Sequence, residues 1–149
     1  MGRSSFPARF LTETERAAIV AAIKDAESKT SGELRVHLDR KSHGDPQGAA
    51  KRVFEKIGMD RTADKNGVLF YIAVADHSFA VIGDAGIDAK VEKDFWDRVS
   101  EQMLAAFKED RFGEGIAAAI RTAGEKLAAS FPRKEGDKNE LPDDVSVGE

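Results

Sequence analysis

One uninterrupted apolar run, GVLFYIAVA at residues 67–75, constrains the fold more than any other part of the sequence. β-Branched and aromatic residues dominate the run, and it is too short to cross a bilayer. A run of this kind is typical of a central strand that is buried on both faces of a sheet. The sequence therefore predicts an α/β protein built around one fully buried strand.

Two further strands are predicted beside this run. Residues 33–39 alternate strictly between apolar and polar side chains, which is typical of a strand with one face better covered than the other. Residues 78–82 follow a predicted two-residue turn at positions 76 and 77, so we expect them to pair antiparallel with the central strand. A helix between the first two strands makes a βαβ unit, whose strands run parallel, and the predicted sheet is therefore mixed.

Four amphipathic helices accompany these strands. The first is predicted to begin at a capping box, with Thr12 as the N-cap and Glu15 three residues later. The other three are predicted within residues 49–57, 88–107 and 112–131. Pro132 ends the last one because proline cannot continue a helix. This number of helices is enough to cover both faces of a small sheet.

The chain has 149 residues, which suits one domain. We expect the domain to span residues 12–131, after an N-terminal arm at residues 1–11. Residues 132–149 are acidic and poor in large apolar side chains, so they are predicted to form a flexible tail. The N-terminus lacks the apolar segment of a signal peptide. We therefore expect a cytoplasmic monomer without membrane insertion.

Composition excludes several classes of site and partner. The 27 acidic and 23 basic residues give a net charge of −4, and no basic stripe with interleaved aromatic residues occurs, so we expect no nucleic-acid partner. The chain contains no cysteine. This excludes disulfides, thiolate zinc sites, iron–sulfur clusters and cysteine nucleophiles.

Four short segments resemble the TPM domain family, whose founding members include a thylakoid-lumen protein of photosystem repair and an accessory protein of acetylcholine receptors. They are TSGELRV at residues 30–36, NGVL at residues 66–69, GDAGI at residues 83–87 and FGEGI at residues 112–116. The segments occur in the order typical of the family and cover roughly residues 10–131. Three others, FLT at residues 10–12, DFWD at residues 94–97 and ELP at residues 140–142, resemble a stand-alone bacterial branch without signal peptide or membrane anchor.

The resemblance implies a fold and a set of functions. The implied fold is a three-layer α/β/α sandwich with a small mixed β-sheet. Members of the family have been linked to acid phosphatase activity, to calcium binding, and to the assembly or repair of membrane complexes. For this chain, the resemblance strengthens the interpretation of one group of acidic residues as a metal site.

That group lies at one end of the predicted sheet. Pairing across the turn at residues 76 and 77 puts Asp84 opposite Leu69, and the start of the parallel first strand lies at this same end. The side chains predicted to converge there are those of Glu33, Asp64, Asn66, Asp84 and Asp88. Carboxylate, amide and carbonyl oxygens are the ligands that Ca²⁺ prefers, while Mg²⁺ accepts fewer of them. The sequence therefore predicts a site for Ca²⁺, or alternatively Mg²⁺, with Asp84 as its leading ligand.

A structural explanation of the same residues stays open, because Asp and Asn are common in turns and at helix starts, where Asp88 would act as an N-cap. Two further acids, Asp110 and Glu114, flank the start of the last helix. Either they interact favourably with the helix dipole or they form a second metal site.

The remaining polar candidates are weaker. No two of the three histidines, His37, His43 and His77, have metal-ligand spacing. His43 lies with Asp39 and Asp45 after the first strand, where a functional role would fit the carboxyl end of a strand.

Other residues are assigned to structure or set aside. Ser31 has no nearby histidine and is a poor nucleophile. Phe95, Trp96 and Phe107 have the spacing of core residues in a helix, although an exposed Trp96 would indicate a partner surface.

Two functions follow from these residues. The first is a non-enzymatic interaction or quality-control module that binds a cation and meets an unidentified protein partner. The alternative is a metal-dependent acid phosphatase that uses metal-bound water, since no Asp-x-Asp nucleophile or phosphate-binding loop is recognisable. A third possibility is a domain held by its core alone, whose turn acids have no special role.

Overall fold

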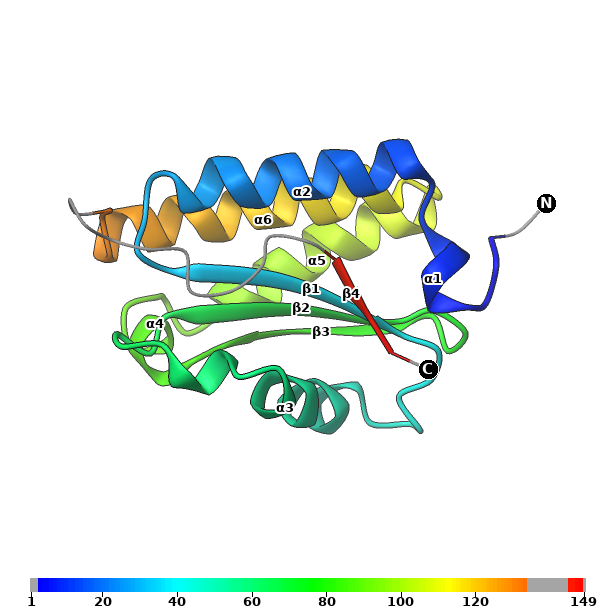
Figure 1. Cartoon of the computed structure of the whole chain (residues 1–149), viewed down its shortest axis with the longest axis horizontal. Helices are drawn as coiled ribbons and strands as arrows, with labels where there is room; N and C mark the ends of the chain where they lie inside the picture. The colour runs from blue at the N-terminus through cyan, green and yellow to red at the C-terminus, as the bar shows by residue number, and fades with distance from the viewer. Residues whose placement is uncertain (1–2, 134–144, 149) are drawn as a thin grey trace.

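The apolar run forms the centre of a four-stranded sheet. This computed structural model describes residues 3–133 and 145–148 (Figure 1). All seven residues of β2 (Gly67–Ala73) are buried. The strand order is β3-β2-β1-β4. β1 (Glu33–Asp39) pairs parallel with β2, and β3 (Ser78–Gly83) pairs antiparallel with it. The predicted mixed sheet with a fully buried central strand is confirmed.

Helices cover both faces of this sheet. Their bounds are α1 (Pro7–Phe10), α2 (Glu13–Glu27), α3 (Pro46–Lys56), α4 (Ala85–Asp88), α5 (Phe95–Lys108) and α6 (Phe112–Ser130), with a 3₁₀ turn η1 (Met59–Arg61). Figure 1 shows α2, α5 and α6 on one side of the sheet and α3 on the other. The three-layer α/β/α sandwich is therefore confirmed.

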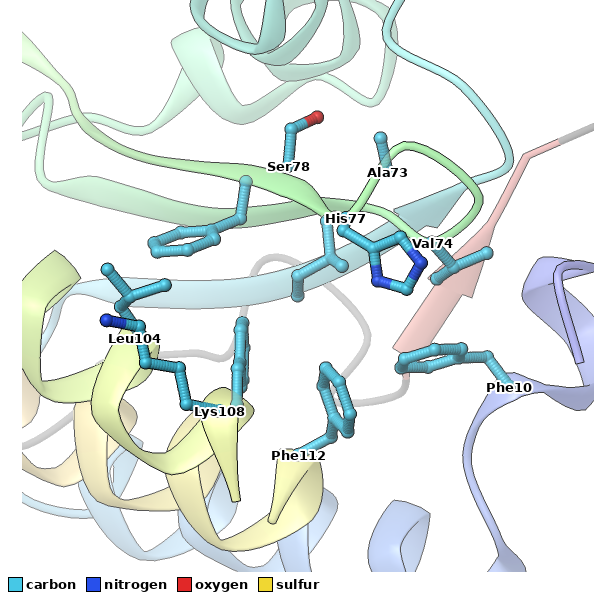
Figure 2. A pocket seen from close by; sticks show the side chains of 11 residues that line it. Phe10, Ala73, Val74, His77, Ser78, Leu104, Lys108 and Phe112 are labelled. Atoms are coloured by element: carbon cyan, nitrogen blue, oxygen red, sulfur yellow. The ribbon is translucent and has the colours of Figure 1, made fainter. Parts of the chain in front are cut away.

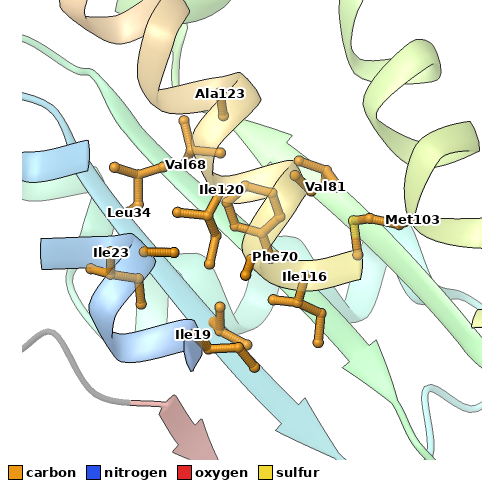
Figure 3. Packing of buried hydrophobic residues seen from close by; sticks show 14 of the residues in the cluster. Ile19, Ile23, Leu34, Val68, Phe70, Val81, Met103, Ile116, Ile120 and Ala123 are labelled. Atoms are coloured by element: carbon orange, nitrogen blue, oxygen red, sulfur yellow. The ribbon is translucent and has the colours of Figure 1, made fainter. Parts of the chain in front are cut away.

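Two hydrophobic clusters fill the space between the layers. The larger one joins Leu34 and Phe70 of the sheet to residues such as Ile120 of α6 (Figure 3). The smaller one joins Leu69 and Tyr71 to the α3 side of the molecule. Successive residues of a strand point to opposite faces, so β2 must be apolar at every position to serve both clusters. This requirement explains the uninterrupted run.

The capping box at the start of α2 is also confirmed. The Glu15 backbone N–H donates to Thr12 Oγ1 at 3.1 Å, and the Thr12 N–H donates to Glu15 Oε1 at 2.9 Å. Two of the N–H groups that a helix start leaves unpaired are thereby satisfied.

The predicted register of the hairpin was wrong by two residues. Ala73 pairs with Ser78, so the turn contains four residues rather than two. His77 has a φ of 55°, in the left-handed region, and closes this longer turn without a glycine. As a result the Asp84 backbone lies opposite Gly67 and not opposite Leu69, and its N–H donates to the Gly67 carbonyl at 2.9 Å.

The predicted start of the helix within residues 88–107 was also wrong, and a separate one-turn helix precedes it. The one-turn helix α4 ends at Asp88 and α5 begins at Phe95. Tertiary contact fixes α4 against the loop before β2, since the N–H groups of Gly86 and Ile87 both donate to the Lys65 carbonyl, at 2.7 and 3.3 Å.

Part of the segment predicted as a flexible tail is a strand. β4 (Val145–Val147) pairs parallel with β1, and the Val145 side chain is buried in the larger cluster. Apolar side chains at positions 145 and 147 flanking Ser146 suit an edge strand, which explains the difference. Residues 134–144, including ELP at 140–142, lie outside the described residues. The division of the chain at residues 12 and 131 stays a prediction.

Within residues 3–133 and 145–148, every helix falls short of the length and apolar content needed to traverse a lipid bilayer.

Candidate functional site

The ends of three strands meet at the edge where the acidic residues were predicted to converge. Glu33 begins β1 and lies opposite Gly67, which begins β2. On the other side of Gly67 lies Asp84, bound through its backbone N–H. The three positions are therefore adjacent across the sheet. Met59 packs over this edge, because a Cβ on Gly67 would lie 3.2 Å from the Met59 carbonyl oxygen.

Asp84 has one satisfied carboxylate oxygen and one that is not. It is the N-cap of α4, and its Oδ1 accepts from the Ala85 N–H at 2.8 Å. Its Oδ2 is buried, and no hydrogen bond reaches it from the described residues. Such an oxygen is costly to desolvate unless something positive or a hydrogen-bond donor meets it.

Asp84 also lines a cavity of about 180 Å³ between the sheet edge, α3 and η1. Glu55 and Asp60 line the same cavity, together with Lys51. Neither Glu55 nor Asp60 was singled out from the sequence. Glu55 lies in α3 and Asp60 in η1, and the packing of these two elements against the sheet brings both residues to the cavity that Asp84 lines.

Asp64 and Asn66 belong to a different set of contacts at the same edge. The Asn66 side-chain amide donates to Ser31 Oγ at 3.2 Å, and Ser31 Oγ donates to Asp64 Oδ2 at 3.4 Å. Asn66 is buried, and its backbone N–H contacts Thr62 Oγ1 at 3.3 Å. Ser31 thus links the loop before β1 to the loop before β2, and it acts as a structural residue.

Asp88 points to another part of the molecule. Its Oδ1 accepts a hydrogen bond from Trp96 Nε1 at 2.9 Å. It is not an N-cap, because Asp84 caps α4 and Asp94 occupies the N-cap position of α5. Trp96 is partly buried against the larger core cluster, and Phe95 is buried. The core role predicted for these two aromatic residues is confirmed.

The predicted residues therefore share one edge but not one cluster. Across the described ranges, 3–133 and 145–148, no three Asp, Glu or His side chains are grouped so that they alone could hold a metal ion. A cation at this edge would have to bind Asp84 together with backbone oxygens, water and the exposed side chains of the same cavity.

Asp110 and Glu114 contact basic side chains near the start of α6. Asp110 Oδ1 accepts from Arg3 Nε at 3.0 Å, and a Glu114 oxygen lies 3.9 Å from Arg111. Glu114 lies in the first turn of α6, which fits the interaction with the helix dipole.

A polar cluster that was not predicted lies at the opposite end of β1. His37 Nε2 lies 2.8 Å from Asp39 Oδ1, and Nδ1 lies 2.7 Å from Ser146 Oγ. The Tyr71 hydroxyl donates to the other oxygen, Asp39 Oδ2, at 2.9 Å. Burial raises the pKa of Asp39, but the hydrogen bonds from His37 and Tyr71 outweigh it, so the pKa lies below its ordinary value.

Serine, histidine and aspartate are the residue types of a nucleophilic triad, yet here they link neighbouring strands. Ser146 belongs to β4, His37 and Asp39 to β1, and Tyr71 to β2. Next to Ser146, the Gly148 N–H donates to the Leu38 carbonyl at 2.7 Å. We therefore assign these contacts to the docking of β4. The sequence could not reveal the whole cluster, because Ser146 lies more than 100 residues from His37.

The loop after β1, which contains His43 and Asp45, is held by capping and turn contacts. Asp45 is the N-cap of α3, and its Oδ1 accepts from the Gly48 N–H at 2.9 Å. Asp76 Oδ2 accepts from the Ser42 N–H at 2.6 Å, which joins this loop to the β2–β3 turn. His43 is exposed, with a φ of 55°. A functional role for His43 stays a prediction.

Comparison with protein families and solved structures gives consistent matches. A family model described as the TPM domain matches residues 5–126. The NMR structure of the BA42 protein from the psychrophilic bacterium Bizionia argentinensis is similar at 45% identity, with a TM-score of 0.87. That match covers 97% of this chain and 100% of the BA42 chain.

A more distant structure is similar in fold alone. It is the N-terminal domain of the cg2496 protein from Corynebacterium glutamicum, at 14% identity and a TM-score of 0.64. The match covers 83% of this chain and 78% of that domain. Comparison with curated proteins gives no match.

Proposed function

This chain belongs to the TPM domain family, and from that premise we propose that it is a non-enzymatic interaction or quality-control module whose edge around Asp84 binds a divalent cation. Ca²⁺ is the expected cation, and Mg²⁺ is the alternative. The cation would order the loops at the starts of β1 and β2, and the ordered surface would meet a protein partner.

The buried Oδ2 of Asp84 is the observation that supports this proposal most. A carboxylate oxygen withdrawn from water without a donor is destabilising, and a bound cation would compensate that cost directly. The Oδ1 of the same carboxylate is fixed by the Ala85 N–H. Asp84 is thereby held in one orientation.

The surroundings of Asp84 suit a hard cation. Two of the three ionisable residues that share its cavity, Glu55 and Asp60, are acidic. Both are exposed, so their carboxylates keep the freedom to turn toward a cation. Oxygen donors of mixed type, completed by water, are the coordination that Ca²⁺ tolerates and that Mg²⁺ commonly retains.

A thermal-shift experiment with Ca²⁺ and with Mg²⁺ tests this proposal. Binding to the native state raises the melting temperature, by an amount equivalent to about 2.7 kcal/mol when the cation is at a hundred times its dissociation constant. The variant Asp84→Asn should lose most of this shift. It should still fold, because Asn is as good an N-cap as Asp.

A matched control is Asp97→Asn. Asp97 is an exposed carboxylate in the first turn of α5, and its removal changes the net charge equally. This control should keep the full cation-dependent shift. The proposal would be overturned if neither Ca²⁺ nor Mg²⁺ changed the melting temperature of the parent protein.

Phosphoester hydrolysis must be measured in the same samples, with and without EDTA. The proposed module should give no turnover of p-nitrophenyl phosphate in any sample. Turnover that EDTA abolishes would instead support the metal-dependent acid phosphatase, in which the cation supplies an activated water.

A further inference from the structure

A second cavity lies at the other end of β2, away from Asp84. Its volume is about 210 Å³, and it opens between the β2–β3 turn, α5 and α6 (Figure 2). Most of its lining side chains are apolar. Leu104 of α5 lies at its edge and is 43% exposed, which makes it one of three large exposed apolar side chains in the described part of the chain. This cavity shares no described lining residue with the cavity of the proposed cation site.

Four aromatic rings form a continuous arc around the cavity. Phe79 contacts Phe107 edge-to-face at 5.3 Å, and Phe107 stacks on Phe112 at 4.7 Å between ring centroids. Phe112 in turn contacts Phe10 edge-to-face at 4.7 Å. The four residues come from β3, α5, α6 and α1, so packing of separate elements builds the arc. A further flat ring entering the cavity can make the same edge-to-face or offset contacts.

The ionisable side chains of the cavity are basic. Among the eleven described residues that line it, they are Lys108 at the end of α5 and His77 in the β2–β3 turn. Figure 2 shows the His77 ring directed toward the cavity from the turn, and the Lys108 side chain extending beside Leu104. Both residues are exposed, so the Lys108 ammonium group and the polar His77 imidazole lie at the mouth, while most of the lining is apolar. This local basic character is notable in a chain whose net charge is −4.

We propose that this aromatic cavity is a binding site for a small carboxylate with an aromatic or branched aliphatic body. The body would lie against the phenylalanine arc, and the carboxylate would face Lys108 and His77. The volume of about 210 Å³ sets the size, since an apolar protein cavity of about 150 Å³ already accommodates benzene. A phenyl ring with a one- or two-carbon acid therefore fits, whereas a long-chain lipid does not.

Three probes that share a benzyl group but differ in charge test the site. They are phenylacetate, phenylacetamide and 2-phenylethylamine, and acetate serves as an anion without the apolar body. Each is titrated into the ¹⁵N-labelled full chain, and amide chemical shifts give both the location and the dissociation constant. We expect phenylacetate to shift residues 72–79 and 104–112 in a saturable way, with a dissociation constant on the order of 1 mM.

Charge selectivity is the sharper expectation. Phenylacetate should bind about 1.4-fold to fivefold more tightly than phenylacetamide, which is the range for a solvent-exposed ion pair of about 0.2–1 kcal/mol. The amine and acetate should show no saturable shifts at the cavity. In Lys108→Gln the ratio of the phenylacetamide and phenylacetate dissociation constants should fall toward one, while the affinity for phenylacetamide stays unchanged.

Two further variants separate this role from general effects of charge or folding. Lys93→Gln removes an exposed cation from the segment before α5 and should leave all affinities unchanged. Leu104→Gln makes the mouth of the cavity polar at an exposed helix position. It should therefore lower the affinity for phenylacetate and for phenylacetamide by the same factor. The amide cross-peak pattern of each variant confirms that it is folded.

Several results would overturn the proposal. These are an absence of saturable shifts with phenylacetate, equal binding of the amine or of acetate, or shifts that map outside the cavity. Concentration-dependent shifts at the cavity without any probe would show instead that a second copy of the chain occupies it.

Discussion

The guanidinium of Arg3 donates hydrogen bonds to both carboxylate oxygens of Glu15, with the Nη2–Oε2 contact at 2.7 Å. Glu15 also accepts from the backbone N–H of Gly113 at 3.1 Å, and Arg3 lies over the rings of Phe10 and Phe112. One carboxylate therefore joins the N-terminal arm, the start of α2 and the start of α6. Arg3, which this carboxylate binds, contacts two of the four rings of the aromatic cavity.

This hub predicts a pH-dependent contribution to stability. Burial opposes ionisation of Glu15, but the hydrogen bonds from Arg3, Thr12 and Gly113 outweigh it and lower its pKa to about 2. The folded pKa lies below the unfolded value, so the stabilisation is fully present above pH of about 4.5 and is lost as the pH falls toward 2. Because the pair is partly solvated, we expect Glu15→Gln to cost roughly 1–2 kcal/mol at neutral pH.

Urea denaturation of the parent and of Glu15→Gln at pH 7 and at pH 3 checks this expectation. Glutamine retains the capping-box geometry, so the variant removes charge and not the cap. Glu13→Gln, in the same first turn of α2 and exposed, is the matched control and should cost less than about 0.5 kcal/mol. A difference between parent and Glu15→Gln that stays constant across the two pH values would contradict the account.

The contact between Tyr71 and Asp39 is predicted to stabilise the end of the sheet where β4 docks. Tyr71→Phe removes the donor to Asp39 Oδ2 and should cost about 1–2 kcal/mol, with a rise in the pKa of Asp39. A double-mutant cycle with Asp39→Asn should give a coupling energy of about 1 kcal/mol, because the two residues are in direct contact. Strict additivity of the two substitutions would show that the hydrogen bond contributes nothing.

Gly86 is predicted to tolerate no side chain. A Cβ at this position would lie 2.1 Å from the Asp64 carbonyl oxygen, so Gly86→Ala must separate α4 from the loop before β2. We expect a loss of about 1–3 kcal/mol in the free energy of unfolding, as for overpacked sites. The neighbouring Ala85→Gly, at an exposed position of the same turn, should cost at most about 1 kcal/mol. Chemical denaturation of both variants measures the difference, and equal losses would refute the steric explanation.

Much of the fold could be predicted from the sequence because its signals are local. The apolar run of β2, the alternation of β1 and the capping box of α2 each depend on residues close together in the chain. The predictions were wrong where contacts between residues distant in the sequence determine the bounds of a helix or strand. Docking of Gly86 on Lys65 fixes the one-turn helix α4 before the predicted third helix, which begins only at Phe95, and pairing with β1 forms the strand at residues 145–147.

The candidate site could be predicted only as an edge of the sheet. Parallel pairing of β1 with β2 correctly predicted that Glu33, at the start of β1, lies at the same end of the sheet as Asp84, although Asp84 was expected opposite Leu69 and lies opposite Gly67. Side-chain partners could not be derived in this way, because Asp88 binds Trp96, while Asp60 shares the cavity of Asp84 through the position of η1. The direction of a side chain depends on these tertiary contacts and not on strand register.

A calcium titration of the ¹⁵N-labelled protein, followed by amide chemical shifts, tests the cation proposal most directly. The account predicts saturable shifts at residues 66–67 and 84–87 in the parent protein. In Asp84→Asn the Ca²⁺ affinity obtained from those shifts should fall by about tenfold, or the shifts should be lost. A tenfold loss corresponds to roughly 1.4 kcal/mol, which is expected when one charged ligand is removed. Shifts that are identical in Asp84→Asn, or that are absent from this edge in the parent at millimolar Ca²⁺, would contradict it.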